Sequence, residues 1–148
     1  MKKGIRFYLI ILLISLLVGC TSSFSFNYEN LKNEVTKVEI IRLSDYEGTL
    51  YPDMDKNYVI LITLVDEEKD KLLLELSKIE FTHFYGSPNY SPKDLCLKLY
   101  YNDGTYGFIN QNTSFRFNED GSKYVTSQSV STSEDSFINL ILQFIELE

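Results

Sequence analysis

The sequence is poor in cysteine and histidine, the residues from which small proteins build disulfides and zinc sites. Among its 148 residues, Cys20 and Cys96 are the only cysteines and His83 is the only histidine. Two cysteines cannot form the disulfide framework of a small secreted domain, and a zinc site usually needs several Cys and His ligands. We therefore expect an ordinary hydrophobic core, with no metal and no cofactor. Hydrophobic residues make up 44% of the chain, which is enough material for such a core.

Basic residues are also scarce, because 14 Lys and Arg stand against 21 Asp and Glu, a formal charge of −7. An acidic surface repels nucleic acid and anionic lipid headgroups, since both carry negative charge. We therefore expect no nucleic-acid partner. Cationic partners are compatible with this charge, but net acidity also serves solubility alone.

The longest apolar run is too short for a permanent transmembrane helix. It extends from Phe7 to Val18 and follows the basic residues Lys2, Lys3 and Arg6. As a helix it would span roughly 18 Å, against the roughly 30 Å hydrocarbon core of a bilayer. A cationic start followed by a short apolar run is typical of a secretory signal peptide. We expect residues 1–19 to be such a signal and to be removed.

The tetrapeptide Leu17-Val18-Gly19-Cys20 at the end of this run resembles the lipobox of bacterial prelipoproteins. The resemblance implies that the Cys20 thiol is alkylated with diacylglycerol and that a signal peptidase cuts just before it. Cys20 would then anchor the chain to the cell membrane, facing outside the cytoplasm, because two acyl chains suffice for stable anchoring. The alternatives are an uncleaved anchor or an ordinary signal with a chance cysteine. The resemblance covers only these residues and implies nothing about the domain that follows.

The remaining residues are enough for one domain of the α+β class. We interpret residues 20–33 as the lipidated cysteine and a tether, although Phe24, Phe26 and Tyr28 alternate and could add an edge strand. We expect residues 34–148 to fold alone as a monomer, with an antiparallel sheet of five or six strands and two packed helices. The helical period of apolar residues places these helices at about 66–79 and 132–147.

Two apolar segments predict the first strands. Residues Val35 to Leu43 change the parity of their apolar positions, which suggests a bulge near Ile40 and Ile41. Residues Tyr58 to Val65 are apolar on both faces and rich in β-branched side chains, which predicts a central strand covered on both sides. Asp66 then suits the N-cap of the first helix.

Two hairpins are predicted in the second half of the chain. Leu95 to Tyr101 and Thr105 to Asn110 flank Asp103-Gly104, which predicts a two-residue type I′ turn with Tyr101 opposite Tyr106. Thr113 to Phe117 and Lys123 to Thr126 form the second hairpin. We interpret Ser127 to Ser133 as a polar linker. Its end, Ser131 to Glu134, matches a capping box that starts the terminal helix.

Few residues of the sequence point to catalytic chemistry. His83 has no second histidine or nucleophile motif beside it, and we interpret it as a surface or strand-edge residue. Cys96 lies inside an alternating strand and is interpreted as a structural thiol. Asp53, Asp55 and Asn57 copy the first half of an EF-hand loop, but Tyr58 and Leu64 occupy the positions that need Gly and Glu. We therefore predict no catalytic residue and no metal ligand.

The strongest loop signal in the chain, from Gly86 to Lys93, lies near several tyrosines. Tyrosine gives a large contact area with a polar tip, which suits binding surfaces, although it is also a good strand former. Our candidate binding loop consists of Tyr85, Gly86, Pro88, Asn89, Tyr90 and Lys93.

Two classes of function fit these observations. The favoured class is a lipid-anchored, non-catalytic binding or regulatory lipoprotein of the bacterial cell envelope, with a protein, peptide or glycan partner. The alternative is a small envelope hydrolase that uses two carboxylates, which would leave no visible motif. A deep pocket with converging acids would favour the hydrolase.

Overall fold

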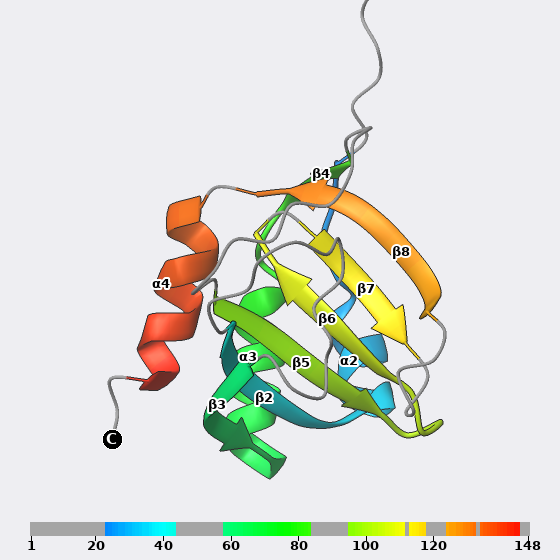
Figure 1. Cartoon of the computed structure of the whole chain (residues 1–148), viewed down its shortest axis with the longest axis vertical. Coiled ribbons are helices and arrows are strands. Elements are labelled where there is room, and N and C mark those ends of the chain that lie inside the picture. The colour runs from blue at the N-terminus through cyan, green and yellow to red at the C-terminus, as the bar shows by residue number, and fades with distance from the viewer. Residues whose placement is uncertain are drawn as a thin grey trace, which may run out of the picture.

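The computed structural model describes residues 23–43, 58–83, 95–111, 113–117, 124–132 and 134–145, and within them the α+β class is confirmed (Figure 1). These residues form eight strands and three helices, whereas the sequence predicted five or six strands and two helices. The elements are β1 (Ser23–Phe24), α2 (Tyr28–Glu34), β2 (Val35–Leu43), β3 (Tyr58–Leu64), α3 (Asp66–Leu76), β4 (Phe81–His83), β5 (Leu95–Tyr101), β6 (Tyr106–Asn110), β7 (Thr113–Phe117), β8 (Tyr124–Ser131) and α4 (Glu134–Ile145).

The strands form one sheet in the order β1-β4-β8-β7-β6-β5-β2-β3. Every neighbouring pair is antiparallel. The predicted pairing of β7 with β8 is confirmed, but β8 runs on to Ser131, so the expected polar linker is wrong for these residues. Their low hydrophobicity hid the strand, because a strand can be held by its backbone ladder without an apolar face.

The helices pack against one face of the sheet and bury the larger hydrophobic core with it. Leu72, Leu73 and Leu76 of α3 are fully buried, as the helical spacing predicted. The first predicted helix was too long, since α3 ends at Leu76. The predicted start of the second helix was too early, since Thr132 is not helical, and its predicted end at residue 147 lies outside the described residues. Asp66 is not the N-cap either. Val65 holds that position without a side-chain cap, and Asp66 is the first helical residue, with φ of 49°.

The segment before β2 belongs to the folded domain from Ser23 onward, which corrects the tether predicted for residues 20–33. The rings of Phe24 and Phe26 lie 5.8 and 5.4 Å from that of Phe81, which is fully buried. In α2, Leu31 joins the core and is only 7% exposed. The alternating aromatic residues in this segment were therefore a packing signal, and a domain cut at residue 34 would lack part of its core.

Strand β3 lies at the end of the strand order, so the prediction of a central strand covered on both faces is wrong. Val59 is 49% and Ile60 48% exposed. The predicted irregularity is present, because the β2–β3 register shifts between Ile40 and Ile41. The extra residue is Leu61 of β3, since β2 pairs with β5 without a break at the same place. Apolar content reports burial or partner contacts, but it does not report where a strand lies in a sheet.

The β5–β6 hairpin is confirmed, but its turn differs from the prediction. Tyr100 lies opposite Tyr106, one residue away from the predicted partner of Tyr106. The Tyr101 N–H donates to the Thr105 carbonyl at 2.8 Å, which leaves a three-residue loop. Gly104 has φ of 80°, and Asp103 is not among the described residues with positive φ. This fits a type I turn followed by a left-handed glycine, whereas a type I′ turn needs positive φ at two positions.

We expect Gly104→Val to lower the free energy of unfolding by about 1 to 2 kcal/mol, because a branched side chain is strained at this positive φ. Gly104→Asn should lose clearly less, since asparagine tolerates the left-handed region. Urea denaturation of the two variants beside the wild type measures both losses. Equal losses would show that the side chain at position 104, and not its backbone angle, sets the cost.

Candidate functional site

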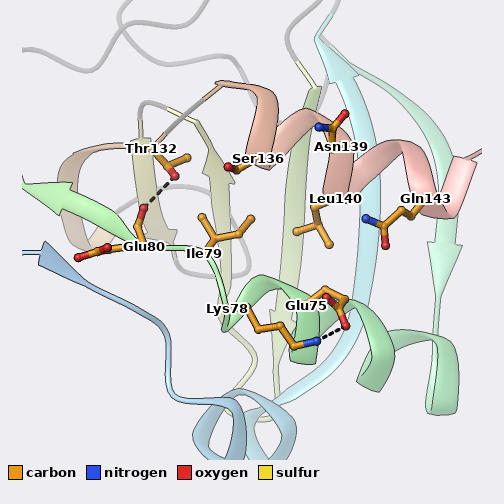
Figure 2. A pocket seen from close by; sticks show the side chains of 9 residues that line it. All are labelled: Glu75, Lys78, Ile79, Glu80, Thr132, Ser136, Asn139, Leu140 and Gln143. Carbon is orange, nitrogen blue, oxygen red and sulfur yellow. Dashed lines mark hydrogen bonds and ion pairs between the residues drawn. The ribbon is translucent and has the colours of Figure 1, made fainter.

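An open groove lies between the end of α3 and the length of α4 (Figure 2). Its volume is about 380 Å³. Two parts of the chain that are distant in sequence, residues 75–80 and 132–143, meet there. Its lining consists of Glu75, Lys78, Ile79, Glu80, Thr132, Ser136, Asn139, Leu140 and Gln143.

The groove has an apolar base and a polar border. Ile79 and Leu140 are only 8% and 3% exposed, and they belong to the main core. Ser136, Asn139 and Gln143 lie along the same side of α4 at spacings of three and four residues, so one helix face presents a hydroxyl and two amides (Figure 2). Each amide offers both donors and an acceptor.

The charged groups of the groove lie on the α3 side. Lys78 donates to the Glu75 carboxylate across 2.5 Å, in an ion pair that remains partly exposed. The Thr132 hydroxyl donates to the backbone carbonyl of Glu80 at 2.8 Å. This bond ties the residue after β8 to the residue before β4 and so joins the two sides of the groove at one end (Figure 2).

This arrangement is suited to recognition by hydrogen bonding. Small-ligand sites commonly occupy about 300 to 1,000 Å³ and combine an apolar base with a few polar groups that orient the ligand. A peptide backbone or a sugar ring presents donors, acceptors and a small apolar face, which matches this lining. The groove is at the lower end of that size range, so it would hold part of a longer molecule.

A second cluster of polar residues lies on the opposite face of the sheet and surrounds Lys98 of β5. The Lys98 ammonium nitrogen lies 4.4 Å from the ring centre of Tyr106 and 4.9 Å from that of Tyr100. It also lies 5.2 Å from the Tyr58 ring centre and donates to the Tyr58 hydroxyl at 3.0 Å. Since Lys98 is only 4% exposed, aromatic faces replace much of the water that its charge would otherwise hold.

The counter-charge for this cluster is Glu39 of β2, the cross-strand partner of Lys98. Glu39 is 4% exposed and accepts hydrogen bonds at 2.8 Å from both Lys37 and the Tyr100 hydroxyl. Burial raises the pKa of Tyr100 well above its usual range, and the hydrogen bond to Glu39 raises it further. Because Glu39 and Lys98 are almost inaccessible, we assign the cluster to the stability of the sheet.

Among the described residues, none that the sequence singled out as a candidate site residue lines the groove. Our candidate binding loop, from Tyr85 to Lys93, lies outside the described residues, as do Asp53, Asp55, Asn57 and Cys20. His83 ends β4 with its backbone paired to Val130. Cys96 is fully buried, which fits a structural thiol because a reactive thiol needs access to solvent.

Sequence reasoning missed the groove, although one signal for it was present. Asn139 and Gln143 interrupt the apolar run from Phe137 to Ile145 at positions four residues apart. Such a pair predicts a polar stripe on α4, but the α3 residues that face it come from a part of the chain some sixty residues earlier.

The described part of the chain contains no group of three or more His, Cys, Asp or Glu side chains that could hold a metal ion. None of the described helices combines the length and the apolar character needed to cross a membrane.

Comparison with models of known protein families, with curated proteins and with solved structures finds no match to this chain.

We expect Tyr100→Phe to flatten the alkaline part of the stability profile. A tyrosine in an unfolded chain has a pKa of about 10, and the folded state raises that of Tyr100. The contribution of Tyr100 to stability is thus complete below about pH 10 and is lost as pH rises further. Denaturant titrations from neutral to strongly alkaline pH should show a steeper loss in the wild type than in the variant. Parallel curves would contradict this role.

Proposed function

We propose that this chain is a lipid-anchored, non-catalytic binding lipoprotein of the bacterial cell envelope, which holds a peptide or glycan in the groove between α3 and α4. The observation that carries the proposal is the short spacing between the lipobox cysteine and the folded domain. Only Thr21 and Ser22 separate Cys20 from Ser23, the first residue of β1.

This spacing supports a domain held directly at the membrane surface. Three residue steps span at most about 11 Å, even when fully extended. At its start the domain is fixed, because Ser23 pairs with Thr82 and Phe24 stacks against Phe81. A lipid on Cys20 would therefore keep the domain closer to the bilayer than the roughly 20 Å expected of a flexible tether.

Charge does not supply the membrane contact in this proposal. Without residues 1–19, which contain three basic and no acidic side chains, the formal charge changes from −7 to −10. Such a surface is repelled by anionic headgroups, so the acyl chains alone hold the protein.

The groove supports binding as the task of the anchored domain. Its border offers hydroxyl, amide and carboxylate groups from α3 and α4 around the apolar pair Ile79 and Leu140. Peptides and glycans of the envelope present matching donors and acceptors close to the membrane. One observation favours the alternative of a hydrolase, since the carboxylates Glu75 and Glu80 line the same groove. Glu75 already pairs with Lys78, which suits an orienting role better than proton transfer.

We expect Cys20 to carry the lipid and residues 1–19 to be absent from the protein in membranes. Mass spectrometry of membrane-extracted protein should find an acylated N-terminal Cys20. Cys20→Ser should accumulate as the uncleaved precursor, because only a thiol forms the thioether. Detection of an intact Met1 in wild-type cells would contradict the proposal.

We expect the double variant Asn139→Ala, Gln143→Ala to weaken ligand binding at least tenfold, about 1.4 kcal/mol, because it removes two hydrogen-bonding amides from the groove. The probe is a set of soluble peptidoglycan fragments, which present both peptide and glycan groups. Shifts of the Ser136 and Leu140 amide resonances on titration measure the affinity.

A matched control is Asn30→Ala, Asn33→Ala, which removes two exposed amides from α2 outside the groove. This control should bind as the wild type does. Equal weakening in the two double variants, or no resonance shift in the wild type, would refute the groove as the site. Cleavage of the fragments by the wild type, lost in Glu75→Gln, would establish the hydrolase instead.

A further inference from the structure

Most of the strongly exposed large hydrophobic side chains among the described residues lie on β3 or directly after it. Four large hydrophobic side chains of the described residues are strongly exposed, and three of them are Val59, Ile60 and Val65. Strand β3 contains no charged residue and no proline from Tyr58 to Leu64. Soluble proteins usually protect a sheet edge with charges or proline, so an uncharged apolar edge is an expected site of strand pairing.

The two ends of this edge carry opposite charge. Arg42, exposed on β2, is the cross-strand partner of Val59 near the start of β3. Asp66, Glu67 and Glu68 are exposed directly after the end of β3, in the first turn of α3. Arg42 shares its face of β2 with Val38 and Ile40, which face the helices. Arg42 and the three acidic residues of α3 therefore all lie on the helix side of the sheet.

An antiparallel pair of identical β3 strands would bring these opposite charges together. In such a pair the start of each strand lies beside the end of the other, and a two-fold axis normal to the sheet keeps both sets of helices on the same face. Arg42 of each copy then approaches Asp66, Glu67 and Glu68 of the second copy. The charge pattern is thus self-complementary, although each copy is acidic as a whole.

The bulge at Leu61 also suits self-pairing, because it determines which residues share a face. Val59 pairs with Arg42 and Leu64 with Val38, both on the helix side, whereas Ile60 and Thr63 pair with Ile41 and Glu39 on the opposite side.

A register that places Val59 opposite Leu64 of the second copy also places Ile60 opposite Thr63, and every pair then shares a face. Leu61 and Ile62, which both pack against the helix-side core, meet at the centre. In a strand without the bulge, the two side chains of each such pair would point to opposite faces of the sheet.

We propose that β3 is a self-association edge, through which two copies of this chain pair in antiparallel orientation and form one continuous sheet. The pair covers Val59 and Ile60 and extends to Tyr58 opposite Val65 of the second copy. This contradicts our sequence-based expectation of a monomer. The contact involves few residues, so the dimer is weak in dilute solution and gains from confinement of both copies to one membrane.

Cysteine cross-linking of the full-length chain in membranes tests the register. Ile60→Cys, Thr63→Cys should form a covalent dimer on mild oxidation, seen on a non-reducing gel. Within one copy these two positions are about 10 Å apart along the strand, too far for a disulfide. The control Val59→Cys, Thr63→Cys places its thiols on opposite faces and should give several-fold less dimer. The chain without introduced cysteines measures the background of covalent dimer that forms through Cys20 and buried Cys96. Because a lipidated Cys20 has no free thiol, a failure of lipidation would appear as dimer in this control.

Charge and edge variants test the same dimer independently. Val59→Lys, added to the Ile60→Cys, Thr63→Cys pair, should abolish the covalent dimer, while Leu74→Lys, at an exposed apolar position of α3, should leave it unchanged. Arg42→Glu should reduce the dimer severalfold, and addition of Glu67→Lys and Glu68→Lys should restore it. Equal cross-linking in both cysteine pairs, or a covalent bond to a different protein in place of a second copy, would overturn the proposal.

Discussion

The architecture depends on the burial of β2 on both of its faces. Val38 and Ile40 face the helix-side core, Ile41 faces the second core on the opposite side, and all three are fully buried. A strand in this position must have neighbours on both edges to satisfy its backbone, and β5 and β3 supply them. The helices in turn cover the face that Val38 and Ile40 define, so the groove between α3 and α4 exists because β2 holds the layer beneath it.

The two faces of the sheet are stabilised by different kinds of interaction. The helix side is a conventional apolar core, in which leucine, isoleucine and phenylalanine side chains from every layer interlock. The other side contains two nearly buried charges, Glu39 and Lys98, whose stability depends on aromatic rings and hydrogen-bonding partners around them. Removal of one charge would leave the other without compensation, so this cluster tolerates paired changes better than single ones.

The α3–α4 groove and the β3 edge are separate from each other, and they support different kinds of contact. The groove is small and bordered by hydroxyl, amide and carboxylate groups, which favours a polar ligand. The β3 edge offers backbone hydrogen bonds and apolar side chains, which favour another strand. A domain anchored through a residue close to β1 could use both at once, since β1 and β3 lie at opposite ends of the sheet (Figure 1).

The sequence by itself determined the α+β class, the helices at α3 and α4, the two hairpins and the positive φ of Gly104, because these depend on local periodicity and turn chemistry. Only the tertiary structure decided that β3 is an edge, that residues from Ser23 pack into the core, and which α3 residues face Asn139 and Gln143. Periodicity reports that a side chain is buried or covered, but it does not identify the neighbour that covers it. The three-residue loop after Tyr101 shows the same limit, since a one-residue difference in register depends on the whole β5–β6 ladder.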